Sequence, residues 1–252
     1  SLVKDPDWPD QDRSVCELND LARETMTEWI ESQLTEDPSL RDRVVPRYPP
    51  FVKRMLQDNG SWLRALQAPH VELVTDAIST VEERGIRCGD VLHEVDVIIY
   101  ATGFDNHRWL YPMRIVGREG RELSREWGDR PRANLGITVP GYPNFFCLYG
   151  PATNLAHAGS LVFTAECQVR YVLGCLRAVL AGDYRSIEVK QSVCDDYNER
   201  LQAWVSQLVW SHGGSSSWYK NSHGEVTANL PWRLVDYWKW TREPELDDYR
   251  LE

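Results

Sequence analysis

The chain has 252 residues, a formal net charge of −10, 42% hydrophobic residues and 26% charged residues. This balance is typical of a folded globular protein and excludes a wholly disordered chain. The acidic charge argues against nucleic acid as a partner, because phosphate binding needs clustered Lys and Arg. No apolar run approaches the roughly 18 residues of a membrane span, and no signal peptide is recognisable. We therefore expect a cytoplasmic protein that does not enter a membrane.

The cysteines and histidines show no pattern of a disulfide framework or a metal site. The cysteines form no C-x-x-C pair, and most of them lie in apolar surroundings, which predicts reduced structural thiols. The six histidines form no H-x-x-x-H or H-E-x-x-H pattern, so no metal site is expected. The six cysteines are Cys16, Cys88, Cys147, Cys167, Cys175 and Cys194.

The first fifty residues predict a polar helix followed by a proline-rich stretch. Apolar residues recur at helical spacing from Leu18 to Leu34, with Ser14 placed to cap the helix and Glu17 at the capping-box position. Prolines between 38 and 50 interrupt the pattern. The loop PPFVKRMLQDNGSW then leads to a short predicted helix at 62–66.

Five short runs predict strands, at 71–74, 77–82, 85–89, 95–100 and 143–151. The run VDVIIY (95–100) is apolar at nearly every position after Asp96, which is typical of a central strand covered on both faces. PNFFCLYGP (143–151) predicts a second apolar strand that ends in Gly-Pro. Neither strand is accompanied by a phosphate loop, because G-x-G-x-x-G and G-x-x-x-x-G-K-[ST] are both absent from the sequence.

The last hundred residues predict two helices and a tail. A small-residue loop (152–160) leads into a long amphipathic helix that stops at Gly182. A second helix is expected at roughly 193–210, followed by a loop-like tail rich in aromatic residues. The apolar positions of the long helix are Leu161, Ala165, Val169, Val172, Leu173, Leu176 and Leu180.

Six stretches, in this order, carry a resemblance to a known family: YPPFVKRMLQDNG (48–60), VDVIIYATGFD (95–105), REWGDRPRANLGITVPGYPNFFCLYGP (125–151), TNLAHAGSLVF (153–163), SSWYKN (216–221) and PWRLVDYW (231–238). Together they resemble the C-terminal part of class B flavoprotein monooxygenases, specifically Baeyer–Villiger enzymes of the 4-hydroxyacetophenone monooxygenase type. The implied fold class is α/β, a partial Rossmann-like flavoprotein with two dinucleotide-binding domains, its C-terminal part bearing helical additions. Residues 1–102 would end the NADPH-binding domain with a helical insertion, and 103–252 would form the C-terminal half of the FAD-binding domain.

The sequence also departs from this family. The family's flavin-binding G-x-G-x-x-G, its F-x-G-x-x-x-H-x-x-x-W fingerprint and its second glycine motif all precede the matched region, and none is present. The chain opens at Ser1 rather than Met. We therefore expect a fragment or one part of a split enzyme, inactive and poorly soluble alone, whose partner is a missing N-terminal FAD-binding segment or chain.

The resemblance implies an activity that needs FAD and NADPH. In such enzymes a C4a-peroxyflavin inserts oxygen from O₂ next to the carbonyl of a small-molecule ketone, giving an ester or lactone, and the cofactor supplies the chemistry. Two alternatives stay open. The first is a flavin N- or S-monooxygenase, and the second is a non-catalytic fragment or interaction domain without the FAD phosphate loop.

Four candidate site residues come from two of the matched motifs. Arg54 matches the family's catalytic arginine, a role that suits a permanently protonated planar donor, and Lys53 matches the contact to the NADPH 2′-phosphate. The alternative is an ordinary solvated Lys-Arg pair. Thr102 and Gly103 resemble the family's hinge between the two domains, where a glycine lets the backbone turn sharply. A structural glycine at the end of a strand is the alternative there.

The remaining candidates lie further along the chain. Gly159 and Ser160 are candidates for backbone contact with the flavin ring, next to the positive end of the long helix. Asn154 and His157 are candidates for the same pocket, with a structural hydrogen bond as the alternative for each. Trp218 matches the family's mobile-loop tryptophan that contacts NADP, with an aromatic packing anchor as the alternative. The aromatic cluster at 232–240 is interpreted as packing.

Overall fold

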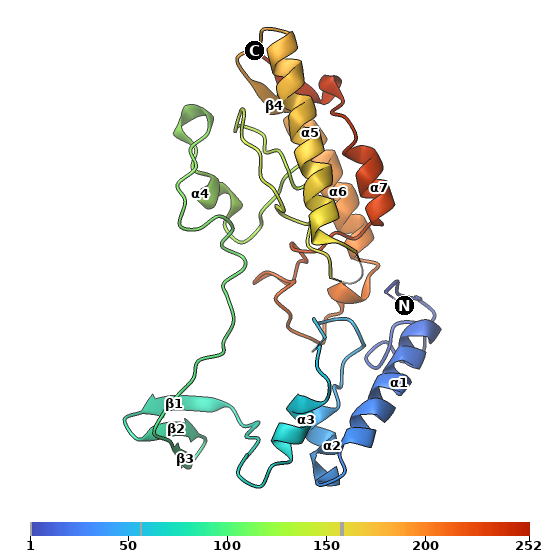
Figure 1. Cartoon of the computed structure of the whole chain (residues 1–252), viewed down its shortest axis with the longest axis vertical. Helices are drawn as coiled ribbons and strands as arrows, with labels where there is room; N and C mark the ends of the chain where they lie inside the picture. The colour runs from blue at the N-terminus through green and yellow to red at the C-terminus, as the bar shows by residue number, and fades with distance from the viewer. Residues whose placement is uncertain (1, 56, 157–158) are drawn as a thin grey trace.

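The structure, a computed structural model, describes residues 2–55, 57–156 and 159–252. The helices α5, α6 and α7 lie side by side at one end of the molecule, and α1 to α3 and a small β-hairpin sheet lie at the other (Figure 1). No helix in the described ranges is long and apolar enough to cross a membrane. The elements are α1 (Glu17–Gln33), η1 (Pro38–Leu40), α2 (Arg41–Val44), α3 (Ser61–Leu66), β1 (Ile78–Glu82), β2 (Gly85–Cys88), β3 (Val91–Glu94), η2 (Arg118–Gly120), α4 (Leu123–Trp127), α5 (Leu161–Ala181), β4 (Ile187–Val189), α6 (Gln191–Val205), η3 (Val209–Ser211), α7 (Leu234–Trp240), η4 (Leu246–Asp248) and β5 (Tyr249–Leu251).

The main core lies around α5, α6 and α7. Gln168 on α5 links two segments of this core. The Gln168 Oε1 accepts from Tyr149 N at 2.7 Å, and the Gln168 Nε2 donates to the Tyr237 hydroxyl on α7 at 2.9 Å. That hydroxyl donates in turn to Leu135 O at 2.7 Å. Strand β4 pairs antiparallel with β5, which returns the C-terminal end of the chain to this core. The buried polar groups are thus hydrogen-bonded to one another, which makes their burial tolerable.

Helix α1 begins later than the sequence predicts. It starts after Cys16, so Ser14 does not cap it and Glu17 is its first residue rather than a capping-box partner. Ser14 is buried, and its Oγ donates to Asp20 Oδ1 at 2.8 Å. The predicted cap is wrong because the Ser14 hydroxyl is already engaged by a neighbouring carboxylate. The short helix predicted at 62–66 is confirmed as α3.

Strands β1, β2 and β3 form a small antiparallel sheet. The strands predicted at 77–82 and 85–89 are confirmed as β1 and β2, whereas 71–74 forms no strand. Strand β1 is mostly exposed and β3 is half exposed, and the sheet lies at one end of the molecule in Figure 1. This hairpin therefore forms from a local feature of the sequence, the alternation of β-branched or apolar residues along its strands.

The prediction of a buried central strand at 95–100 is wrong. The run leaves the hairpin as a single extended stretch, and Val97, Ile99 and Phe104 are 74%, 86% and 98% exposed. None of the described residues forms a backbone hydrogen bond with 96–104. A β-strand is stabilised by backbone hydrogen bonds to a neighbouring strand, and no described segment lies beside this one to form them.

Two further boundaries differ from the sequence prediction. The run at 143–151 forms only an isolated bridge, between Phe146 and Thr138, so it is not a strand. Helix α6 ends at Val205 rather than near 210, and the predicted loop-like tail contains α7 and β5. The sequence did not indicate α7 because the many aromatic residues of the tail mask the helical spacing of this short segment.

Helix α5 is confirmed, and Gly182 follows its last residue as predicted. Its buried face differs from the one that the apolar spacing predicts, because it consists of the hydrogen-bonding and thiol side chains Thr164, Cys167, Gln168, Tyr171 and Cys175. All six cysteines are free thiols, and all but Cys16 are buried, which confirms reduced structural thiols.

Candidate functional site

A cavity of about 780 Å³ brings together segments that are far apart in the sequence. It is lined by the loop around Arg54, by Trp218 and Leu2, and by Tyr149, Asn154, Leu155, Ala156, Gly159 and Leu161. Arg54 Nη1 donates to Ala156 O at 3.2 Å, a link between residues 102 positions apart. The cavity therefore lies where three loops meet, which is a common arrangement for a ligand site.

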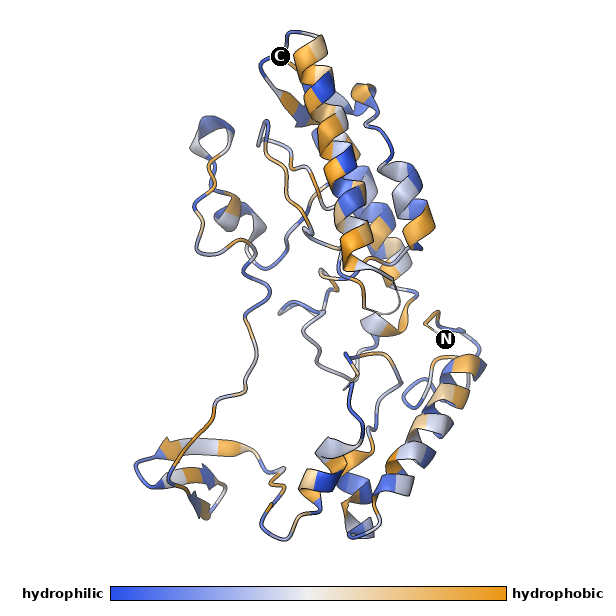
Figure 2. Ribbon diagram, in the orientation of Figure 1, coloured by the Kyte–Doolittle hydropathy of each residue, from blue (hydrophilic) through white to orange (hydrophobic). Residues whose placement is uncertain are grey.

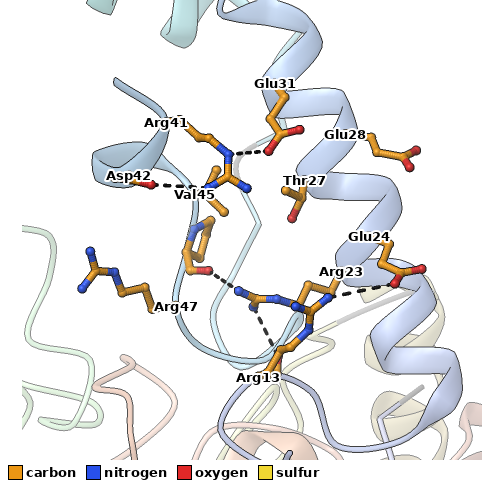
Figure 3. Close-up of a pocket in the computed structure, with 11 residues that line it drawn as sticks. Arg13, Arg23, Glu24, Thr27, Glu28, Glu31, Arg41, Asp42, Val45 and Arg47 are labelled. Carbon is orange, nitrogen blue, oxygen red and sulfur yellow. Dashed lines mark hydrogen bonds and ion pairs between the residues drawn. The ribbon is translucent and has the colours of Figure 1, made fainter. Parts of the chain in front are cut away.

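The loop that carries Arg54 is held by packing on one side and by α1 on the other. Val52 is wholly buried in the main core, two residues before Arg54. Asn19 of α1 donates to Pro50 O at 3.2 Å, and Arg23 donates to Tyr48 O at 3.0 Å and to Pro46 O at 2.9 Å. Figure 3 shows the Arg23 side chain projecting from α1. Sequence reasoning missed both α1 residues, because each acts on a backbone carbonyl of a distant loop.

The cavity and its rim are positively charged. No ion pair between described residues includes Arg54 or Lys53. Lys53 Nζ lies 4.8 Å from the centroid of the Tyr48 ring, a cation–π contact that leaves its charge uncompensated. Burial lowers the pKa of the Lys220 amine, and the charges of Lys4 and Lys53 lower it further. Arg54 lines the cavity and Lys53 lines the adjoining hollow, and these two cations favour an anionic ligand there.

The N-terminus of α5 opens at the edge of the same cavity. Ser160 caps the helix, and its Oγ accepts from Phe163 N at 3.2 Å. Gly159 has φ +120° and lines the cavity, and a Cβ at this position would lie 2.6 Å from Leu234 Cδ1. Glycine is favoured there, because the backbone angle and the neighbouring leucine both oppose a side chain. The start of a 21-residue helix thus lies at the cavity that Arg54 lines, at a place suited to negative charge.

Asn154 lines the cavity, and its side chain is engaged by neighbours. Its Oδ1 accepts from the Tyr149 hydroxyl at 3.0 Å, and its Nδ2 donates to Asn229 Oδ1 at 2.7 Å. Tyr219, which the sequence did not single out, is wholly buried nearby with no hydrogen-bond partner for its hydroxyl among the described residues. Burial raises the pKa of Tyr219, and the charge of Arg54 opposes that rise. Tyr219 is therefore a neutral hydroxyl close to a cation.

Trp218 covers one side of the cavity. Its ring is 44% exposed and makes an edge-on contact with the Tyr219 ring, with 4.6 Å between centroids. Asn106 Nδ2 donates to Trp218 O at 2.5 Å, so the extended stretch after 95–100 reaches this loop. Together with Lys53, Arg54, Ser216 and Ser217, Trp218 also lines a shallower hollow of about 400 Å³.

The structure thus brings most of the predicted site residues together. Arg54, Asn154, Gly159 and Trp218 line one cavity, with Lys53 in the adjoining hollow and Ser160 at the start of α5. Thr102 and Gly103 are exposed and line neither; Gly103 has φ +82°, with open space around it. His157 lies outside the described residues.

A second hollow, between α1 and α2, does not have the features of a ligand site. It measures about 620 Å³ and is lined by four arginines and several carboxylates (Figure 3). Arg41 pairs with Glu31 at 2.5 Å, and Arg13 pairs with Asp20 at 3.2 Å. Arg41 and Arg13 are thus paired with carboxylates at the surface, in contrast to Arg54.

Comparison with known proteins gives relatives but no family. No family model matches the chain. The chain is 48% identical over 254 residues to an uncharacterized monooxygenase of Sinorhizobium fredii, a match that covers 99% of this chain and 38% of the relative. It is 40% identical over 185 residues to a Baeyer–Villiger monooxygenase of Pseudomonas aeruginosa, covering 73% of this chain and 35% of that protein.

The chain is a partial homologue of flavin-binding monooxygenases, Baeyer–Villiger monooxygenases among them. Solved structures agree. An oxidized steroid monooxygenase bound to NADP superposes with a TM-score of 0.80 at 27% identity, over 97% of this chain and 46% of that one. A Rhodococcus cyclohexanone monooxygenase bound to NADP⁺ gives a TM-score of 0.80 at 26% identity, over 96% of this chain and 46% of that one. The chain spans less than half the length of these relatives.

Proposed function

We propose that this chain supplies the Arg54 side of the active site of an NADPH- and FAD-dependent monooxygenase that inserts oxygen next to a ketone carbonyl. The observation that carries the proposal is the convergence of Arg54, the α5 N-terminus and Trp218 on one cavity, where Arg54 has no carboxylate partner among the described residues. The ordered motifs favour the 4-hydroxyacetophenone monooxygenase type within this group.

The residues of the cavity fit part of the two cofactors. The first N–H groups of α5, beside Gly159 and Ser160, suit the electron-rich edge of a flavin ring. Lys53 and Trp218 line the hollow that Arg54 also lines. Lys53 suits a phosphate, and Trp218 suits a nicotinamide. The sequence contains no glycine-rich phosphate loop, so a companion segment has to hold the pyrophosphates.

The reaction balances as ketone plus O₂, NADPH and H⁺ giving ester, NADP⁺ and water. The bound cofactors supply the electrons and activate O₂. The role of Arg54 is to stabilise negative charge on oxygen next to the ketone, and its guanidinium stays protonated throughout. Asn19, Arg23 and Val52 fix its loop, so the cation is held in place before the substrate binds.

The test is oxygenation by this chain co-expressed with the unmatched part of the Sinorhizobium fredii relative, which has to provide the phosphate loops. Arg54→Ala should lower kcat about 10²–10³-fold with FAD still bound, since one charged donor to a developing oxyanion is lost. Arg54→Lys should recover little, because a point charge does not reproduce the planar fork. Arg47→Ala, at an exposed arginine earlier on the same loop, is the matched control and should keep full activity.

Full ketone oxidation by Arg54→Ala would contradict the proposed role. Product analysis with a ketone, an amine and a thioether decides the substrate class. Oxygenation of the amine or thioether alone would replace the proposal with a flavin N- or S-monooxygenase. A complex that binds FAD without oxidising NADPH would show a non-catalytic chain.

A further inference from the structure

The side-chain amide of Asn154 is held in one orientation by two neighbours. The Tyr149 hydroxyl accepts from Leu155 N at 3.1 Å, and its own proton is donated to Asn154 Oδ1 at 3.0 Å. At the other end of the amide, Asn154 Nδ2 donates to Asn229 Oδ1 at 2.7 Å. Reversing the amide would leave the Tyr149 proton without this acceptor, so the observed orientation is the favoured one.

The backbone of Asn154 is fixed as well. Asn154 N donates to Ala228 O at 2.9 Å, and Leu230 N donates to Asn154 O at 2.9 Å. Asn154 and Asn229 are paired in a parallel β-bridge, and Asn229 is wholly buried. Asn154 is therefore oriented before any ligand arrives, which is the condition under which a hydrogen-bond donor contributes most to a reaction.

One N–H of this amide is left over. An asparagine amide carries two N–H donors, and the hydrogen bond to Asn229 uses one of them. Asn154 Nδ2 makes no other hydrogen bond to a described residue. Asn154 is half-buried and lines the cavity that Arg54 also lines. The second N–H is therefore available to a ligand in this cavity, and its partner has to be an acceptor.

The surroundings of this N–H favour a carbonyl oxygen as that acceptor. In Figure 2 the loops between the two groups of helices are mixed in hydropathy, and apolar side chains line much of the cavity. Arg54 can only donate, so a ligand oxygen between the two residues would accept from both. An amine, protonated at neutral pH, would instead add a positive charge next to Arg54, and the sulfur of a thioether is a weak acceptor. The apolar residues of the lining are Leu2, Phe51, Met55, Leu155, Leu161 and Trp218.

We propose that Asn154 is a second hydrogen-bond donor, besides Arg54, to the carbonyl oxygen of the ketone, and that Tyr149 and Asn229 are the positioning residues that orient its free N–H. This inference rests on the proposed function, which supplies the ketone. Negative charge grows on a carbonyl oxygen when a nucleophile adds to the carbonyl carbon. A fixed donor at this oxygen therefore stabilises the adduct more than it stabilises the ketone.

The experiment uses the assembled protein of the Arg54 test, with acetophenone isotope-labelled at its carbonyl carbon as the probe. Without NADPH, the infrared band of the bound carbonyl should lie at lower frequency than in an apolar solvent, because a hydrogen bond to the oxygen weakens the C=O bond. Asn154→Leu should move this band to higher frequency and, with NADPH present, lower kcat/KM about 100-fold with FAD still bound. Asn154→Asp should lose at least as much, because a carboxylate offers no donor.

Tyr149→Phe and Asn229→Leu test the two positioning residues. Each change removes one of the partners that orient the amide and leaves Asn154 in place. Each should move the carbonyl band in the same direction by a smaller amount and lower kcat/KM about tenfold, which is the effect of one neutral hydrogen bond. Asn229→Asp keeps an acceptor oxygen and should restore most of the band position and of kcat/KM, which a purely structural role would not predict.

Asn144→Asp is the matched control. The amide of Asn144 is also engaged at both ends, since it accepts from Ile187 N and donates to Arg185 O, at 3.0 Å each. Asn144 is not among the residues that line the cavity. Loss of its N–H should leave the carbonyl band unmoved and kcat/KM within about twofold of the original value.

Three results would overturn the inference: no band of bound acetophenone, a band that Asn154→Leu leaves unmoved, or full activity of Asn154→Asp, which would show that this position presents an acceptor. An unmoved carbonyl band together with a shifted FAD absorption spectrum in Asn154→Leu would assign the free N–H to the flavin instead. Failure of the proposed function reads out separately, because a carbonyl band that responds to these variants in a protein that oxidises no ketone leaves the donor role of Asn154 intact.

Discussion

The two ends of the molecule are stabilised in different ways. Among the described residues, the main core around α5, α6 and α7 joins 22 buried apolar residues, whereas the cluster under α1 to α3 joins Leu34, Leu40, Leu63 and Leu66. The candidate site lies between them, and Val52 attaches its arginine loop to the larger core. Lys53 and Arg54 are therefore held by the better-packed end, while the smaller end contributes the hydrogen bonds of Asn19 and Arg23 to their loop.

The largest effect is expected from a cavity in the larger core. Leu201 on α6 is 1% exposed, and Leu201→Ala should lower the free energy of unfolding by about 4 kcal/mol. Urea unfolding followed by circular dichroism measures it. A loss below about 1 kcal/mol would mean that this end can close around a missing side chain, and it would remove the contrast between the two cores.

The same truncation in the smaller cluster should act locally. Leu63 on α3 is 6% exposed, and Leu63→Ala should cost about 2 kcal/mol. Native-state hydrogen exchange should show lost protection in α1 to α3, with α5 to α7 unchanged. Equal loss of protection in both regions would show that they unfold as a single cooperative unit.

An effect of similar size is expected where the cavity meets α5. Gly159→Ala should cost about 2 kcal/mol, because its φ of +120° and the 2.6 Å approach of Leu234 both oppose a Cβ. Gly128→Ala is the control, at φ +50° with open space around the Cβ, and should cost about 1 kcal/mol. Equal losses would mean that Leu234 moves aside without cost.

The smallest effect is a pH dependence at the far end of the larger core. Burial raises the pKa of Glu188, but hydrogen bonds from Arg118 at 2.5 Å and Gly141 N at 2.9 Å outweigh it, so the folded pKa lies below 4.5. The stabilisation is therefore complete above the unfolded pKa and is lost as the pH falls through the folded pKa. Glu188→Gln should be less stable than the original chain at pH 7, with a difference in Tm that shrinks below about pH 4. A constant difference in Tm would assign the effect to packing.

The sequence predicts best what neighbouring residues decide. The period of α5, its end at Gly182, helix α3 and strands β1 and β2 all depend on local spacing, and all are present in the structure. The grouping of Arg54 with Gly159 and Trp218 on one cavity also agrees with the motif order. The bounds of α6 are less well predicted, because its end depends on the turn at 206–208 rather than on its apolar spacing.

The failed predictions for the strand at 95–100 and for the buried face of α5 concern burial by distant segments. VDVIIY has the composition of a central strand, but composition cannot supply the neighbouring strands that bury it. On α5 the apolar spacing points to a row of residues that are exposed, Val169, Leu173, Leu176 and Leu180. Gln168 and Tyr171 are buried instead, because Tyr237 and Tyr249, some seventy residues later, satisfy their polar atoms. Such pairings leave no local signal in the sequence.

The buried thiols have a consequence for a protein proposed to handle activated oxygen. Burial raises the pKa of Cys147 and Cys175 to about 11 and that of Cys194 to about 12, and it raises the pKa of Cys167 in the same direction. Oxidants attack the thiolate, and at pH 8 a thiol with a pKa of 11 is ionised on the order of one part in a thousand. These four sulfurs therefore resist conversion to sulfenic acid, so an oxidant that escapes the site would react only slowly with the thiols of the core.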